Sequence, residues 1–189
     1  FLQADILQLK SLNKKFDIVE SVGVLHHMEN PIEGIRTLKD LLEPHGLLLI
    51  GLYSEKARQE VVRAKKFAKN CKFENTNNGI RMFREAIFKE KEDLLLKKIS
   101  NGKDFYSMSS VKDLVFHAQE HRFTLIQISQ ILEDLNLEFL GFRNKIIKKE
   151  YFKVFPLDKK NISLTNWNKF ENLEPRTFTG MYNFWVKKK

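Results

Sequence analysis

Two short apolar runs near the start of the chain predict two buried strands. Residues 16–22 (FDIVESV) and 47–53 (LLLIGLY) are bounded by polar or turn residues. Between them, residues 31–43 place apolar side chains at helical spacing, with Asn30 as the N-cap and Pro31 in the first position. Strand, helix and strand with short connections predict a βαβ unit, and strands that are apolar on both faces indicate a parallel sheet covered by helices.

The rest of the chain alternates predicted helices with two further strands. Two capping boxes, Ser110-x-x-Asp113 and Thr124-x-x-Gln127, predict the starts of two helices. A strand end is predicted at residues 2–9, and it stops at Asp5. Helices are predicted at 55–69, 82–99, 110–120 and 124–136, with a loop at 75–79 between the first two. The last predicted elements are a strand at 137–142, a helix at 166–173 and a strand at 181–186.

The length, the cysteine content and the apolar runs predict the number of domains and the location of the protein in the cell. The 189 residues predict one domain, and the single cysteine, Cys71, excludes an internal disulfide and fits a reducing, cytoplasmic location. No run approaches the roughly 18 apolar residues of a membrane span, so no membrane partner is expected. The start, FLQADILQL, lacks the features of a signal peptide and an initiator Met, and we expect the sequence to begin inside a larger protein.

A net charge of +9 is compatible with an anionic partner such as RNA. The lysines occur singly or in pairs from Lys10 to Lys189, without a concentrated arginine cluster. This distribution favours solvated lysines spread over helix faces. A binding module that uses a basic surface stays an alternative.

Residues 117–121 (HAQEH) match the H-x-x-E-H pattern of a class of zinc proteases. On a helix, His117 and His121 would share one face and could hold zinc, with Glu120 as general base of a hydrolase. No cysteine and no third ligand accompanies the pattern. We therefore expect no metal, and we favour a helix whose histidines hydrogen-bond to a pocket or to the backbone.

The adjacent pair His26-His27 follows the first predicted strand. Neighbouring histidines do not easily face one metal, whereas ligands of open parallel sheets bind beyond the carboxyl ends of the strands. The position therefore favours the wall of a ligand pocket. The alternative is that one histidine packs under the loop and the other is exposed.

Three blocks of sequence in a fixed order resemble the second half of a class I S-adenosylmethionine-dependent methyltransferase. The blocks are Ala4-Asp5-Ile6, then residues 16–28 (FDIVESVGVLHHM), then residues 41–51 (LLEPHGLLLIG), and the strands at 137–142 and 181–186 look like the closing antiparallel pair of that family. The resemblance implies a Rossmann-like α/β fold with a mostly parallel sheet and flanking helices. It implies methyl transfer from S-adenosyl-L-methionine to an unidentified small-molecule, protein or RNA acceptor.

The resemblance also implies roles for individual residues. Asp5 and Ile6 would contact the adenine, Ser21, Val22 and Gly23 would line the methionine side of the cofactor, and His26 and His27 would lie where the methyl group meets the acceptor. One histidine could take a proton from the nucleophile, or both could only shape the pocket.

The chain also departs from the family pattern. The glycine-rich loop and the acidic strand end that hold the rest of the cofactor are absent, so the resemblance implies a single partial domain, residues 1–189, that begins within the third strand of the fold. Residues 55–130 would be a helical insertion, and Asp104, Tyr106, His117, His121 and Arg122 within it would contact the acceptor. A capped helix packed on the sheet is the alternative for this segment. The insertion resembles a block of bacterial methyltransferases, some of them fused to tetratricopeptide repeats, which an upstream region could carry. A catalytically degenerate methyltransferase-like module is the alternative to an enzyme.

Overall fold

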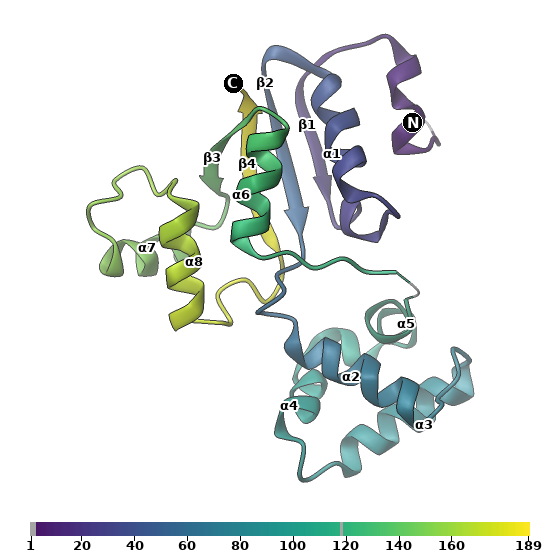
Figure 1. Cartoon of the computed structure of the whole chain (residues 1–189). Coiled ribbons are helices and arrows are strands. Elements are labelled where there is room, and N and C mark those ends of the chain that lie inside the picture. Colours follow the sequence, from purple (N-terminus) through teal and green to yellow (C-terminus); the bar gives the residue numbers. More distant parts are fainter. Residues whose placement is uncertain (1–2, 118) are drawn as a thin grey trace. The chain divides into compact units, whose positions relative to one another are not determined.

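The computed structural model describes residues 3–117 and 119–189, and the chain divides into two compact units (Figure 1). The sheet unit comprises Phe1–Ala57 and Gln119–Lys189, and the helical unit comprises Arg58–Ala118. The helical unit lies within the predicted insertion at 55–130, whereas the helix that follows residue 124 belongs to the sheet unit.

The sheet unit is built on a mixed sheet in the order β1-β2-β4-β3. Its strands are β1 (Phe16–Val22), β2 (Leu42–Leu52), β3 (Leu137–Phe142) and β4 (Tyr182–Lys188). β1 pairs with β2 in parallel, and β4 runs antiparallel to both β2 and β3. The predicted βαβ unit and the closing antiparallel pair are therefore confirmed, in an α/β fold.

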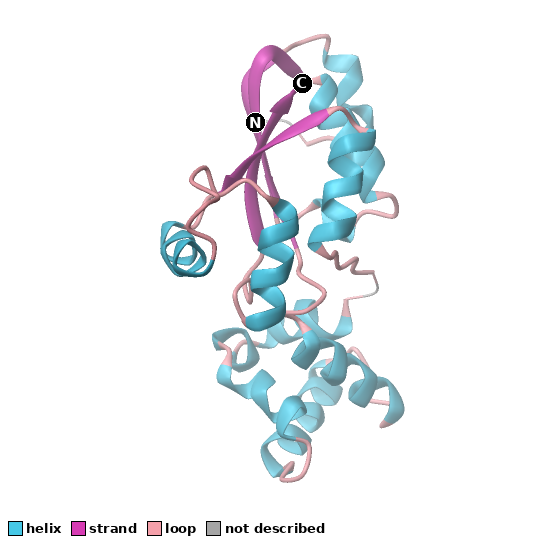
Figure 2. Cartoon of the chain, turned by 60° about the vertical axis from the view of Figure 1, so that its left-hand side comes forward, coloured by secondary structure: helices cyan, strands magenta, loops and turns pink. Residues whose placement is uncertain are grey.

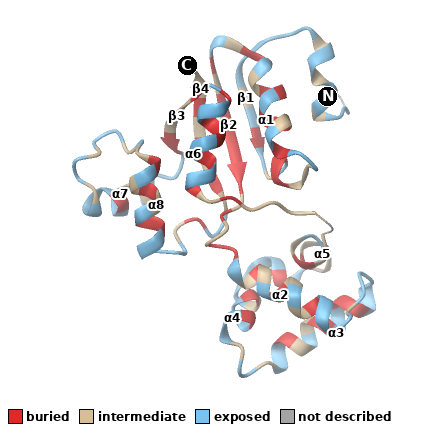
Figure 3. Cartoon of the chain, viewed as in Figure 1, coloured by how far each residue is buried: buried red, intermediate tan, exposed pale blue. Residues whose placement is uncertain are grey.

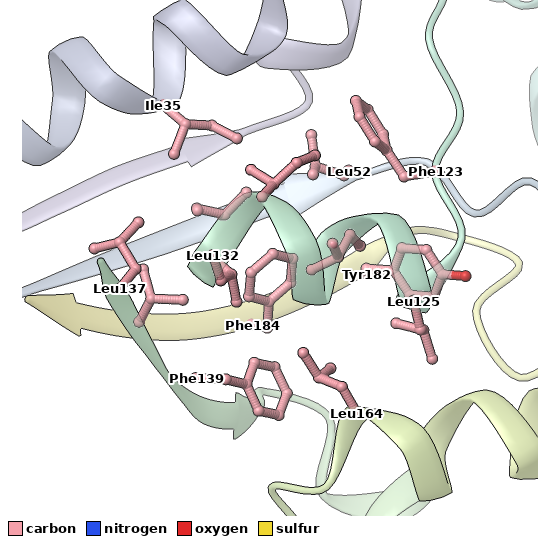
Figure 4. Packing of buried hydrophobic residues seen from close by; sticks show 14 of the residues in the cluster. Ile35, Leu52, Phe123, Leu125, Leu132, Leu137, Phe139, Leu164, Tyr182 and Phe184 are labelled. Carbon is pink, nitrogen blue, oxygen red and sulfur yellow. The ribbon is translucent and has the colours of Figure 1, made fainter. Parts of the chain in front are cut away.

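Helices α1 (Pro31–Asp40) and α6 (Leu125–Asp134) cover one face of the sheet (Figures 1 and 2). Both begin at the predicted caps, since Asn30 accepts a hydrogen bond from Glu33 N and Thr124 forms a complete capping box. Their apolar sides pack onto the side chains of β2, β3 and β4 that face them (Figure 4). This shared core holds the carboxyl ends of β1 and β2 in place.

The strand β1 is more exposed than the sequence predicts. Most residues of β1 belong to the exposed class by which Figure 3 is coloured. Phe16, Ile18 and Val22 expose 40%, 59% and 40% of their surface. β1 is an edge strand of the sheet that the described residues form, and these side chains have no strand beside them there. The prediction of a strand buried on both faces is wrong for this part of the chain.

The predicted strand end at residues 2–9 is also wrong within the described residues. Ile6–Leu12 form a 3-10 helix, and Asp5 caps it by accepting a hydrogen bond from Leu7 N at 2.9 Å. Asp5 is followed by a helical turn because its side chain satisfies a free amide of that turn.

A pair of helices connects β3 to β4. The sequence predicts α8 (Leu164–Leu173) within two residues, whereas α7 (Lys145–Val154) has no counterpart among the predicted elements. The two helices are joined by Tyr151 and Trp167, whose rings stack at 3.7 Å, and Trp167 Nε1 donates to Asn161 O.

The helical unit has a core of its own, centred on Phe83. It contains α2 (Gln59–Asn70), α3 (Asn77–Lys89), α4 (Leu94–Lys97) and α5 (Met108–Phe116), with 3-10 turns at Lys98–Asn101 and Lys103–Tyr106.

The helical unit corrects two predictions. The predicted loop at 75–79 is instead the start of α3, because Thr76 caps Gly79 N. The predicted helix at 82–99 is interrupted after Lys89, where Glu90 Oε1 accepts the amides of the next three residues. No helix within residues 3–117 and 119–189 is both long enough and apolar enough to span a membrane.

Candidate functional site

Three connections of the sheet unit meet beyond the carboxyl ends of β1 and β2. They are the 3-10 turn Leu25–His27 after β1, residues 53–57 after β2, and residues 119–123. Backbone hydrogen bonds join them, from His121 N to His26 O at 2.8 Å, from Phe123 N to Tyr53 O at 2.9 Å and from Glu55 N to Phe123 O at 2.9 Å. In open sheets this edge is where ligands bind.

Two glycines shape the turn that carries the histidine pair. Gly23 has φ +79°, a conformation that favours glycine and that redirects the chain after β1. Gly34 on α1 provides room, because a Cβ there would lie 2.8 Å from Leu25 Cδ2 and 2.6 Å from Met28 Sδ. The turn can therefore pack closely against α1 with Leu25 fully buried.

The two histidines differ in exposure. His26 is fully buried, and its ring lies 3.7 Å from the ring of Tyr53. His27 is half-buried, and its ring lies 4.4 Å from that of His26 in an edge-on arrangement. His26 therefore forms a wall of the site, and His27 is the histidine that can meet a ligand.

A backbone contact fixes the tautomer of neutral His27. Its Nδ1 lies 3.1 Å from the carbonyl oxygen of Gln119. Because a carbonyl oxygen only accepts, Nδ1 carries the hydrogen, and Nε2 is the acceptor atom of the neutral ring. The contact therefore assigns the acceptor role of this ring to Nε2.

Gln119 orients a second histidine. Its Nε2 donates to Met28 O at 3.2 Å, which fixes the direction of the side-chain amide. The same Nε2 lies 3.3 Å from His121 Nε2, which must accept. Gln119 therefore connects the turn after β1 with His121.

Arg122 forms ion pairs with two glutamates at the site. Its Nε donates to Glu55 Oε2 at 2.9 Å, and its guanidinium lies 3.6 Å from Glu120 Oε1. The side chain of Arg122 is 24% exposed and that of Glu120 only 1% exposed. Arg122 thus bridges the segments that leave and re-enter the sheet unit.

A buried carboxylate, that of Glu171 on α8, lies next to these segments. Ser54 Oγ donates to Glu171 Oε1 at 2.6 Å, and Tyr182 OH lies 2.8 and 2.7 Å from its two oxygens. Glu171 is fully buried, and the loss of solvation raises the pKa of its carboxyl, although the hydroxyl groups of Ser54 and Tyr182 and the charge of Lys56 partly oppose this.

The raised pKa of Glu171 predicts a pH-dependent stability. The folded protein holds the Glu171 proton more tightly than the unfolded chain, so this stabilisation is complete below the ordinary value of 4.5 and is lost as the pH rises through the folded value. Glu171→Gln cannot titrate. The free energy of unfolding of the natural protein, measured relative to Glu171→Gln by chemical denaturation, should therefore fall from pH 4.5 upward. A difference that rises over that range would contradict the prediction.

Of the predicted site residues, His26, His27, His121 and Arg122 lie together in the sheet unit. The predicted cofactor residues Ser21, Val22 and Gly23 come directly before this turn. Asp5 and Ile6 lie at the start of the 3-10 helix Ile6–Leu12, with Asp5 exposed. Asp104, Tyr106 and His117 belong to the helical unit, and their role stays a prediction.

Sequence reasoning missed Tyr53, Gln119 and Glu171. Tyr53 ends the predicted second strand, so its place at a strand's carboxyl end was the available signal. Gln119 and Glu171 both lay inside predicted helices, so neither carried a signal.

The H-x-x-E-H pattern does not form the predicted helical pair. α5 ends at Phe116, and His117 and His121 lie outside helices. Residue 118 lies outside the described residues. No group of three or more His, Cys, Asp or Glu side chains suited to a metal ion occurs among the residues that the structure describes. The geometry therefore gives no support to the zinc hydrolase alternative.

Comparisons with known sequences find similarity over part and over most of the chain. Residues 1–50 match the family model Methyltransf_11, described as a methyltransferase domain. A protein of Synechococcus sp., described as uncharacterised, is 26% identical over 155 residues, which cover 77% of this chain and 36% of that protein.

Solved structures are similar over almost the whole chain. PKMT2 from Rickettsia typhi matches 98% of it with a TM-score of 0.73 at 13% identity, and the same protein in complex with AdoHcy matches 97% with a TM-score of 0.72 at 12% identity. The chain spans 38% of each of these chains and 36% of the Synechococcus protein. The structural matches show a Rossmann-like α/β fold, and the sequence similarity to a methyltransferase domain is confined to residues 1–50.

Proposed function

We propose that this chain is the C-terminal part of an S-adenosyl-L-methionine-dependent methyltransferase, with its site at the carboxyl ends of β1 and β2. The observation that carries the proposal is the position of His27, half-buried and held through Nδ1 by the Gln119 carbonyl, directly after the strand that matches a methyltransferase domain. The AdoHcy complex of PKMT2, which shares this fold, supports the choice of cofactor.

The residues present suit one side of such a cofactor. At Gly23 an added Cβ would meet only Met181 Cε within 4 Å, at 3.8 Å, so the backbone is accessible there. Val22 exposes 40% of its surface, and Ser21 Oγ is buried with no hydrogen-bond partner among the described residues. Val22 and Gly23 would contact the cofactor, and the carboxylate of Asp5 is exposed for the predicted contact with the adenine.

A chain segment preceding Phe1 would complete the domain. The support is the unpaired edge of β1 within the described sheet and the exposure of Phe16 and Ile18 on it. Such a segment would also complete the cofactor site. We further propose a cytoplasmic location, which fits the free thiol of Cys71.

The cofactor supplies an electrophilic methyl group, and the residues of this chain prepare the acceptor. His27 Nε2 would take the proton of an acceptor N–H or O–H group as that atom attacks. The Gln119 carbonyl keeps the ring in the required tautomer, and the tilted ring pair of His26 and Tyr53 forms the wall behind it. The acceptor, whether small molecule, protein or RNA, would be recognised near His121 and Arg122. A role of Asp104, Tyr106 and His117 of the helical unit in acceptor binding stays a separate proposal.

Titration calorimetry of the intact protein with S-adenosylhomocysteine tests the proposal. We expect one site per chain with a dissociation constant in the micromolar range, about −8 kcal/mol. No heat of binding at concentrations up to about 1 mM would contradict it.

A further inference from the structure

Ser54 is the residue through which Glu171 reaches the site. Ser54 Oγ donates to Glu171 and accepts from Ala57 N at 3.0 Å, so its orientation is fixed on both sides. Ser54 also forms a parallel bridge with Phe123. The buried hydroxyl group of Ser54 therefore connects α8 to the segment that leaves the sheet unit. The backbone bridge between Ser54 and Phe123 then connects this segment to the one that returns.

The residues on either side of Ser54 both belong to the candidate site. The ring of Tyr53 packs on His26 at 3.7 Å, and Glu55 accepts the hydrogen bond of Arg122 at 2.9 Å. Because both residues are bonded directly to Ser54, the hydrogen bond that holds Ser54 inward also limits where their side chains can point. A shift of Ser54 would therefore move both contacts.

We propose that Glu171 is a positioning residue of the candidate site: its buried carboxylate holds Ser54 and thereby sets Tyr53 against His26 and Glu55 against Arg122. The link to methyl transfer rests on the proposed function, whereas the anchoring does not. Glu171 acts through Ser54 and contacts no reacting atom.

A carboxylate suits this role better than an apolar side chain. The hydroxyl groups of Ser54 and Tyr182 both reach Glu171, and hydrogen bonds to an ionised acceptor are shorter and stronger than neutral ones. Removing the acceptor leaves two buried hydroxyl groups unsatisfied at once. Ser54 would then be released from α8.

Amide hydrogen exchange of the intact protein tests the anchoring at two amides. Glu55 N and Phe123 N donate across the bridge, so both report its opening. In Glu171→Leu we expect both amides to exchange at least about tenfold faster than in the natural protein. The matched control is Tyr151→Phe, which removes another tyrosine–carboxylate hydrogen bond of the sheet unit, 2.5 Å from Asp158, and should leave both rates unchanged.

Two further variants keep the test decisive. Ser54→Ala should also make the amides of Glu55 and Phe123 exchange faster. If Glu171→Leu does not fold, the exchange rates of Ser54→Ala test the anchoring instead. Glu171→Gln, which retains one oxygen acceptor, should restore most of the protection. Equal exchange of Glu55 and Phe123 in Ser54→Ala and Tyr151→Phe would overturn the proposal. Failure of the natural protein to bind S-adenosylhomocysteine would instead refute the proposed function, without changing the outcome at these amides.

Discussion

Replacing His27 by Gln should lower the rate of methyl transfer about 100-fold, the lower end of the range for loss of a general base. Gln is similar in size and can still donate a hydrogen bond to the Gln119 carbonyl, so the packing of the turn should persist. It cannot take a proton at neutral pH. The measurement is the initial rate of label transfer from radiolabelled S-adenosyl-L-methionine to an extract of the source cells, catalysed by the intact protein.

The variant His45→Gln is the control for this experiment. His45 is exposed on β2 and belongs to none of the connections that form the site. It should keep the full rate, and both variants should bind S-adenosylhomocysteine as the natural protein does. A His27→Gln variant with an unchanged rate would show that His27 only borders the site and that positioning alone suffices.

Replacing Trp167 by Ala should lower the free energy of unfolding by about 3–5 kcal/mol. Trp167 is fully buried, stacks on Tyr151 at 3.7 Å and meets Phe142 edge-on at 4.9 Å. The substitution leaves a cavity between α7, α8 and the sheet and removes the hydrogen bond to Asn161 O. Chemical denaturation followed by far-ultraviolet circular dichroism measures the loss.

Phe152→Ala provides the comparison, because Phe152 is an aromatic residue of α7 that exposes 43% of its surface. Its loss should be smaller than that of Trp167→Ala by about 2 kcal/mol or more, since less apolar surface returns to water. Equal losses for the two variants would contradict the assignment of Trp167 to the core that supports α8.

Local patterns predicted most of the sheet unit. The apolar runs at 16–22 and 47–53 located β1 and most of β2, and the caps Asn30 and Thr124 located α1 and α6. Such signals depend on residues close together in the chain, so a single sequence contains them. The predicted end of the helix at Glu120 was wrong, because α5 ends at Phe116. The residues that follow contact the turn after β1, where the carbonyl oxygen of Gln119 meets His27.

The candidate site was only partly predictable for the same reason. The position of His26 and His27 after a strand indicated a pocket, but their different exposures depend on Tyr53 and Gln119, which are distant in sequence. The contact of Glu171 with Ser54 spans 117 residues, and no local pattern marks it. The pattern at 117–121 was predicted to lie on a helix, and this was wrong because α5 ends at Phe116.

Amide hydrogen exchange of the intact protein with and without S-adenosylhomocysteine tests the proposed cofactor site. Exchange in residues 21–27 should be slower when the ligand is present, because the proposed cofactor site lies against Val22 and Gly23 at the carboxyl end of β1. Residues 145–154 of α7 should exchange at the same rate in both conditions. Saturating ligand that leaves the exchange of residues 21–27 unchanged would contradict the central claim.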